Sequence, residues 1–176
     1  NFFQNLIDLC VKNGILLVND NPYSFILNEN PTSLLYNNEN CENCLELNSL
    51  SKSHNMAGWR LGMVVGSKNN IQSILKIKSN MDSGMFFPVQ QGAIEALNQN
   101  KKWYSDLNSI YKKRKDIVIE ICNKLNLKHY KNGLGLFLWA KINNSSTKSK
   151  DFTDELLYSK NIFITPGSIF GTAGEG

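Results

Sequence analysis

The stretch SLSKSHNMAGWRLGMVVG, from Ser49 to Gly66, holds one lysine among small hydroxyl residues and one arginine eight positions after it. A lysine in a loop is normally solvated, but Lys52 follows a predicted strand, and ligands of open α/β sheets bind beyond strand ends. An amine that attacks a carbonyl needs a fixed position and a lowered pKa, and a neighbouring cation lowers the pKa of a lysine. The stretch therefore predicts a lysine nucleophile, with Arg60 able to bind a phosphate.

A carboxylate and a phenol stand at the end of another predicted strand. Asp20 comes shortly after the apolar run ILLV, and Tyr23 lies three residues further on. An aspartate near Pro22 is also a common turn residue. A carboxylate suits a cationic ring nitrogen, however, and a phenol can reach a ring hydroxyl. Together with Lys52 and Arg60, these groups favour a phosphorylated pyridine aldehyde bound to the lysine.

Helical and strand patterns alternate along the chain. Helices are predicted where apolar residues recur every three to four positions, and buried strands where they form short continuous runs. Such alternation is typical of an α/β architecture. A long helix, followed by a strand, a helix and a strand, predicts a second, smaller α/β domain. The predicted helices are 2–12, 70–79, 88–98, 102–125 and 151–160, and the predicted strands are 15–18, 44–47, 61–66, 133–142 and 162–165, with Lys52 in a loop.

Three motifs resemble those of one enzyme family. NDNPYSF (residues 19–25), the lysine stretch, and NIFITPGSIFG (residues 161–171) come in the order found in the class I and II aminotransferases of fold type I, which use pyridoxal phosphate. The resemblance covers nearly the whole chain. It implies that residues 1–104 are the C-terminal half of the large, mostly parallel-sheet domain that binds the cofactor. Residues 105–176 would be the small α/β C-terminal domain, incomplete at its C-terminus.

The resemblance also implies a role for each candidate residue. The cofactor would be pyridoxal 5'-phosphate, held as a Schiff base, and the catalytic group would be the amine of Lys52. The implied cofactor-binding residues are Asp20 at the pyridine nitrogen, Tyr23 at the ring hydroxyl, Ser49 and Arg60 at the phosphate, Ser51 as a second hydroxyl, and Lys52 itself.

The activity implied is the transfer of an amino group between an amino acid and a 2-oxo acid, both small molecules. The resemblance further implies a homodimer whose active sites are completed by the partner subunit. The apolar loop MDSGMFFP, residues 81–88, is predicted to line that interface or the site wall, because clustered apolar loop residues seek a partner. The alternative is that this loop packs into its own core.

Other functions remain open at this stage. The same scaffold supports β-lyases and decarboxylases, because the fold alone does not determine the reaction. A non-catalytic, aminotransferase-like effector domain of a transcription regulator is a further alternative, in which KKRK (residues 112–115) would contact DNA. A third alternative is an inactive chain that has only a structural role.

Composition narrows the choice of partners and location. The net charge of +4 is too mild to indicate nucleic acid, and no run of 18 apolar residues indicates a membrane span. No metal site is predicted, because CENC (residues 41–44) has no second such pair and a structural zinc needs four ligands. The absence of a secretory signal pattern favours a cytoplasmic enzyme of amino acid metabolism.

The arginine count leads to one more expectation. The chain has two arginines, and Arg114 lies in the basic run YKKRKD, where a solvated helical face is typical. With Arg60 assigned to phosphate, no arginine is left for a substrate carboxylate. The family's phosphate-binding loop, ring-stacking aromatic residue and site asparagine also have no counterpart before Phe2. We therefore expect the carboxyl-terminal part of a longer enzyme, a fragment that turns over poorly by itself.

Overall fold

The computed structural model describes residues 2–36, 38, 42–130, 132–143 and 146–176. They form two compact units. The first unit contains residues 1–109 together with 134–136, and the second contains residues 110–133 and 137–176. Both contain helices and strands, as the α/β prediction requires. The units part inside one continuous helix, so the domain boundary predicted after residue 104 stays a prediction about the whole protein.

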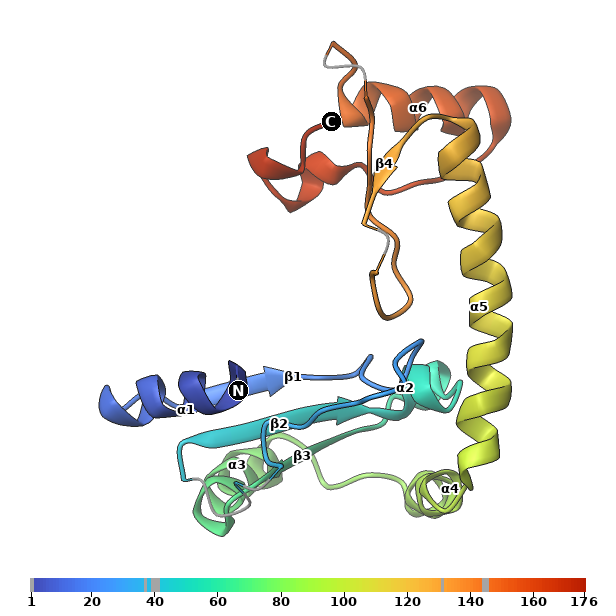
Figure 1. Ribbon diagram of the computed structural model, residues 1–176. Helices are drawn as coiled ribbons and strands as arrows, with labels where there is room; N and C mark the ends of the chain where they lie inside the picture. Colours follow the sequence, from blue (N-terminus) through green and yellow to red (C-terminus); the bar gives the residue numbers. More distant parts are fainter. Residues whose placement is uncertain (1, 37, 39–41, 131, 144–145) are drawn as a thin grey trace. The chain divides into compact units, whose positions relative to one another are not determined.

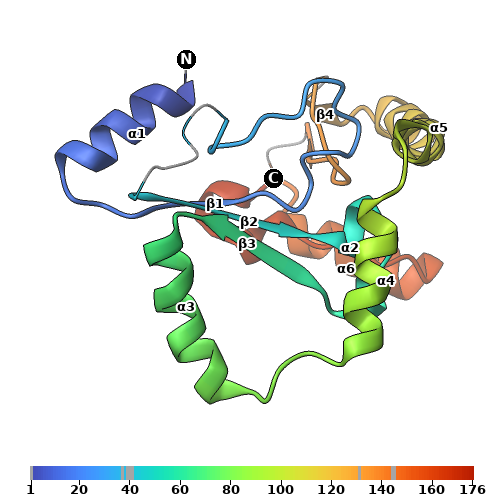
Figure 2. The same cartoon turned by 90° about the horizontal axis from the view of Figure 1, so that it is seen from below.

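A three-stranded sheet forms the centre of the first unit (Figure 2). Its strands are β1 (Leu17–Asp20), β2 (Cys44–Ser49) and β3 (Gly62–Gly66), in that spatial order. β1 runs parallel to β2, whereas β3 is antiparallel to β2. The three strands match the predicted runs, although β1 begins two residues later and therefore ends on Asp20 itself.

Local sequence signals account for the helices of this unit. Ser67 caps the start of α3, since its side chain accepts a hydrogen bond from the backbone N–H of Asn70. α4 has a proline in its first turn, where the missing N–H costs nothing. The helices are α1 (Phe2–Lys12), α3 (Lys68–Met81), α4 (Phe87–Leu97) and the beginning of α5 (Lys101–Lys124), close to the predicted ranges.

Two small hydrophobic clusters hold the first unit together. One packs the segment around the lysine onto α4 and contains Leu50, Met56, Leu61 and Ala93. The other packs α1 against β2 and contains Ile7, Leu34 and Cys44. Full burial of one such aliphatic side chain contributes about 1.5–3 kcal/mol relative to its exposed state. The lysine segment is thus anchored by its flanking apolar residues.

The second unit consists of the rest of α5, a short hairpin-like pair and α6 (Figure 1). β4 (Lys128–His129) pairs antiparallel with β5 (Ala140–Lys141), and α6 spans Ser149–Lys160. Two 3₁₀ turns follow, Gly167–Phe170 and Thr172–Gly174.

Two predicted strands of this unit are wrong. Of the run 133–142, only Ala140–Lys141 forms a strand, and residues 134–136 belong to the first unit. Gly135 has φ +81°, which interrupts an extended strand. The run 162–165 forms no strand within the described part of the chain, although it is apolar. A short apolar run signals burial, and it becomes a strand only beside a partner with which it can pair.

The described residues contain neither a membrane-spanning helix nor a cluster of metal ligands. Among the described helices, none combines the length and apolar character needed to cross a membrane. Within the same residues, no group of three or more His, Cys, Asp or Glu side chains is placed to hold a metal ion. Cys41, the first residue of the CENC motif, lies outside the described residues.

Candidate active site

One edge of the sheet collects the candidate residues. The parallel pairing of β1 and β2 brings their carboxyl ends to the same edge, where Asp20 lies opposite Leu47. Neighbouring strands are about 4.8 Å apart, so Asp20 and the end of β2 are close in space. β3 begins at Gly62, opposite Ser49, which places the preceding Arg60 at this edge as well. In Figure 2 the α2 segment (Leu50–Ser53), which contains Lys52, lies where β2 ends.

Lys52 lies on a short helix, α2 (Leu50–Ser53), whereas the sequence predicted a loop. The helix forms because Ser49 caps it: the Ser49 Oγ accepts a hydrogen bond from the Ser51 N–H at 3.1 Å. The Ser49 Oγ also lies 3.0 Å from the Ser51 Oγ and 3.2 Å from the Leu61 carbonyl oxygen. The two serines thus form one hydroxyl pair at the start of the helix, directly before the half-buried lysine.

Arg60 is held in an uncommon backbone conformation at the end of the 3₁₀ turn Ala57–Trp59. Its φ and ψ are 54° and 48°, in the left-handed region, which costs a non-glycine residue about 1–2 kcal/mol. Its side chain is exposed, and one guanidinium nitrogen donates to the Ala57 carbonyl oxygen at 2.9 Å. A guanidinium carries five N–H donors in a rigid fork, so this one bond orients the group and leaves it able to bind an anion.

Asp20 and the loop after it are held by a residue that the sequence analysis missed. Glu46, on β2, is only 8% exposed. Its carboxylate accepts hydrogen bonds from the side chains of Asn19 and Asn21, at 3.4 and 3.3 Å. It also accepts from the Ser33 hydroxyl at 2.8 Å and from the Leu34 N–H at 2.7 Å. Glu46 therefore closes the loop 21–34, which carries Tyr23.

Tyr23 lies in a turn of that loop, half-buried. Its carbonyl oxygen accepts a hydrogen bond from the Ile26 N–H at 3.0 Å. Gly135 approaches closely, since a side chain there would start 3.7 Å from the Tyr23 Cβ. The Gly135 N–H donates to the Ile26 carbonyl oxygen at 3.0 Å, which ties segment 134–136 to the loop.

A second group that the sequence analysis missed lies behind the lysine. His54 is buried, and it contacts Trp103 and Tyr104 of α5. Burial lowers the pKa of His54, so the imidazole is neutral near pH 7. No local pattern marks this histidine, because its partners lie some fifty residues away in the sequence.

The donor set fits a phosphorylated pyridine aldehyde. Its parts would be bound by an amine, a guanidinium with two hydroxyls, a carboxylate and a phenol. Lys52, Arg60, the serine pair, Asp20 and Tyr23 supply these groups, all from the first unit. The chemistry of this set therefore fits a pyridoxal phosphate site, in which the amine of Lys52 would be the covalent anchor.

Comparison with known sequences points to the same chemistry. The sequence model described as aminotransferase class I and II matches residues 1–176. An LL-diaminopimelate aminotransferase from Oleidesulfovibrio alaskensis is 38% identical over 178 residues, which cover 99% of this chain and 46% of that protein. The chain thus spans about half the length of the curated relatives it matches.

The chain is also similar to solved aminotransferase structures. Substrate-bound BacF from Bacillus subtilis is 32% identical and superposes with a TM-score of 0.90, over 99% of this chain and 45% of that one. An aspartate aminotransferase from Thermotoga maritima is 28% identical with a TM-score of 0.85, again over 99% of this chain and 45% of the other.

Proposed function

The chain belongs to the class I and II aminotransferase family, and from this premise we propose that the whole protein moves an amino group between an amino acid and a 2-oxo acid. The match confirms the predicted family and its use of pyridoxal 5'-phosphate, and the superpositions confirm the predicted fold type I, of which the chain is a part. The single observation that carries the proposal is the gathering of Asp20, α2 with Lys52, and Arg60 at one sheet edge.

We assign the amine of Lys52 two tasks. It binds the cofactor covalently, and it then takes the proton from the substrate Cα and returns it as a general acid. When bound, the cofactor supplies an electron sink for the charge that develops at that carbon. The cap by Ser49 fixes the backbone of the short helix from which the Lys52 side chain extends.

The other residues would hold and polarise the cofactor. Asp20 would keep a proton on the ring nitrogen, because an opposite charge within about 4–6 Å favours the charged form of a group. Tyr23 would donate a hydrogen bond to the ring oxygen. Arg60 and Ser49 would bind the phosphate, and the Ser51 hydroxyl, 3.0 Å from that of Ser49, would be the second hydroxyl donor.

The substrate is proposed from the names of relatives. Several curated relatives are called LL-diaminopimelate aminotransferase, whereas a solved neighbour is called an aspartate aminotransferase. LL-diaminopimelate is therefore the first amino donor to test, and aspartate the second. Elimination and a non-catalytic DNA-linked role are not proposed, because the relatives that name an activity are transferases.

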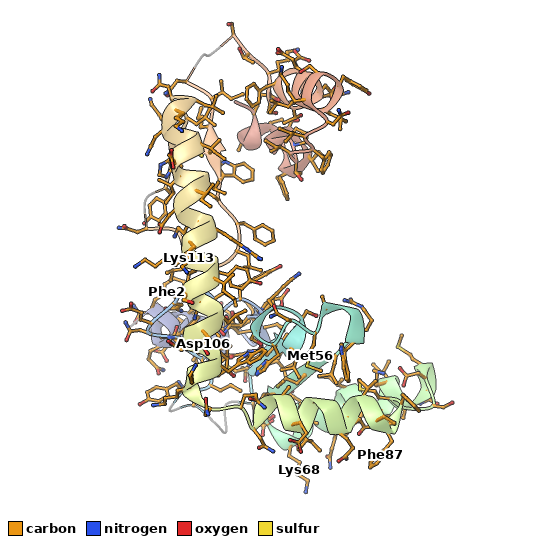
Figure 3. All side chains as sticks on the ribbon, turned by 90° about the vertical axis from the view of Figure 1, so that its right-hand side faces the viewer. Phe2, Met56, Lys68, Phe87, Asp106 and Lys113 are labelled. Carbon is orange, nitrogen blue, oxygen red and sulfur yellow. The ribbon has the colours of Figure 1, made fainter. Side chains whose placement is uncertain are left out.

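We further propose a homodimer. Phe86 and Phe87, both within the predicted loop 81–88, are 72% and 66% exposed (Phe87 is labelled in Figure 3). The alternative, in which this loop packs into its own core, is wrong for these two side chains. An apolar pair of this kind suits a subunit interface. Sedimentation of the whole protein tests the proposal, which a stable, active monomer would contradict.

The predicted cytoplasmic location, like the expectation of no nucleic-acid partner, stays a prediction.

The test of function is a half-reaction. The whole protein, loaded with pyridoxal phosphate, is mixed with LL-diaminopimelate or aspartate in the absence of an acceptor. Transfer predicts one equivalent of pyridoxamine phosphate and one of 2-oxo acid per site. Ammonia release without pyridoxamine phosphate would instead indicate elimination and would overturn the proposal.

A further inference from the structure

One face of α5 contacts both elements that carry the proposed cofactor-binding residues. Trp103 and Leu107 are four residues apart, as are Tyr104 and Asn108, so each pair shares a side of the helix. Leu107 is buried, and the other three are half-buried. In Figure 3 the start of α5, marked by Asp106, lies beside the segment that contains Met56. All of these residues belong to the first unit.

Toward the lysine, this face holds a chain of hydrogen bonds. The Tyr104 hydroxyl lies 3.3 Å from His54 Nε2, and His54 Nδ1 lies 2.9 Å from the Ser53 Oγ. The Ser53 hydroxyl donates to the Ser49 carbonyl oxygen at 3.3 Å. The Ser53 hydroxyl thus lies between His54 Nδ1 and the Ser49 carbonyl oxygen, and which imidazole nitrogen donates depends on the tautomer of His54.

Stacking and a further hydrogen bond reinforce this contact. The Trp103 indole N–H donates to the Ser53 carbonyl oxygen at 2.9 Å. The Trp103 and His54 rings stack with their centroids 6.1 Å apart, and Tyr104 meets His54 edge-on at 5.5 Å. The helix that carries Lys52 is therefore attached to α5 through its last residue and the one after it.

Toward Tyr23, the same face holds the loop 21–34. The Tyr104 ring stacks on Phe25 with the centroids 5.2 Å apart. The Asn108 side chain accepts from the Leu27 N–H at 2.8 Å and donates to the Phe25 carbonyl oxygen at 2.9 Å. Leu27 has φ +52°, a conformation that a leucine keeps only when its surroundings impose it. Asn108 is thus a fixed partner for a strained loop.

We propose that Tyr104 is a positioning residue that sets the Lys52 helix against the Tyr23 loop, an inference that rests on the proposed function for the roles of Lys52 and Tyr23. Its hydroxyl acts on the lysine side through His54, and its ring acts on the tyrosine side through Phe25. Asn108 completes the attachment of the loop. The cofactor ring, bound between Lys52 and Tyr23, would then be held by two elements whose separation α5 fixes.

Tyr104→Phe and Tyr104→Leu separate the two contacts. Phe keeps the ring and loses the hydroxyl, whereas Leu loses both. Hydrogen exchange is measured by mass spectrometry in the cofactor-free whole protein, on peptides covering residues 50–56 and 23–30. Tyr104→Phe should speed exchange in the first peptide by roughly three- to tenfold, the effect of one lost neutral hydrogen bond, and leave the second unchanged. Tyr104→Leu should speed both.

Two further variants complete the design. Asn108→Ala should speed exchange only in peptide 23–30, because it releases the Leu27 N–H. Tyr158→Phe is the matched control, since Tyr158 is 83% exposed on α6, and it should change neither peptide. The positioning role is overturned if Tyr104→Phe exchanges at the wild-type rate in both peptides, or if this variant accelerates exchange equally in both.

A second measurement separates this inference from the proposed function. The pH midpoint of the absorbance of the bound cofactor should shift in Tyr104→Phe and not in Tyr158→Phe. If borohydride attaches the cofactor to Lys52 while Tyr104→Phe leaves both exchange and midpoint unchanged, the positioning role is wrong and the proposed function stands. If Lys52 is not labelled, the proposed function fails, and the exchange results still test the attachment itself.

Discussion

Replacement of Glu46 by alanine should release the loop that carries Tyr23. The carboxylate accepts four hydrogen bonds, of which those from the Ser33 hydroxyl and the Leu34 N–H are short, at 2.8 and 2.7 Å. A hydrogen bond to a charged acceptor contributes about 1.5–3 kcal/mol, and a buried N–H left without a partner costs about 1–3 kcal/mol. Leu34 is 1% exposed, so its N–H lies away from bulk water.

These contributions overlap, since the same oxygen receives both short bonds. We therefore expect Glu46→Ala to lower the free energy of unfolding by about 3 kcal/mol, and Glu46→Gln, which keeps one oxygen acceptor, by about half as much. Urea unfolding of the whole protein, with the slope compared between variants, measures both values. The loop peptide 23–30 should also become more sensitive to protease, because its closing contacts are lost.

Glu120→Ala is the control for this experiment. Glu120 lies on α5 and pairs with Lys124 at 2.8 Å, but both side chains are more than half exposed. An exposed pair of this kind contributes about 0.3–0.5 kcal/mol. If Glu46→Ala costs no more than Glu120→Ala, then the buried carboxylate does not hold the loop, and the account of how Tyr23 is positioned is wrong.

Three further predictions concern single residues. Asp20→Asn should slow the half-reaction of the whole protein by roughly 100-fold or more while changing cofactor affinity little. If the variant and the wild type react at equal rates, Asp20 is only a turn residue. Burial lowers the pKa of His54 below its usual value of 6.5, so the unfolded chain binds the proton more readily than the folded chain. The free energy of unfolding of the wild type should therefore fall as the pH falls through 6.5. His54→Gln should flatten the stability–pH curve in this range. Gly167→Ala should lower the free energy of unfolding in urea by about 1–3 kcal/mol, because the added methyl group would overlap the Gly174 carbonyl oxygen. Gly133→Ala is the control and should lower it far less, because the nearest atom to the added methyl group would be 3.7 Å away.

Much of the first unit follows from local pattern. The ILLV run and the CLEL run became neighbouring parallel strands, so Asp20 and the lysine segment meet at one edge. That meeting could be predicted because parallel strands end together. The helix that contains Lys52 was missed because it is one turn long and depends on the cap by Ser49, a contact between residues two positions apart with no periodic signal.

The supporting residues could not be predicted, for a different reason. Glu46 bonds to residues 12 to 27 positions away, and Tyr104 bonds to a residue 50 positions away. Such contacts exist only once the loop and α5 are folded, and a single glutamate in the mostly apolar run CLEL gives no sign of them. The predicted strand at 133–142 failed similarly, since residues 134–136 contact the Tyr23 loop across the chain.

The most direct test of the account is the identity of the lysine that binds the cofactor. The whole protein is loaded with pyridoxal phosphate, reduced with borohydride and digested, and the labelled peptide is sequenced by mass spectrometry. The account predicts one equivalent of label on Lys52, and none in Lys52→Ala, which should still bind the cofactor without a covalent bond. Label on Lys68, on Lys76 or on any other lysine would contradict the site described here.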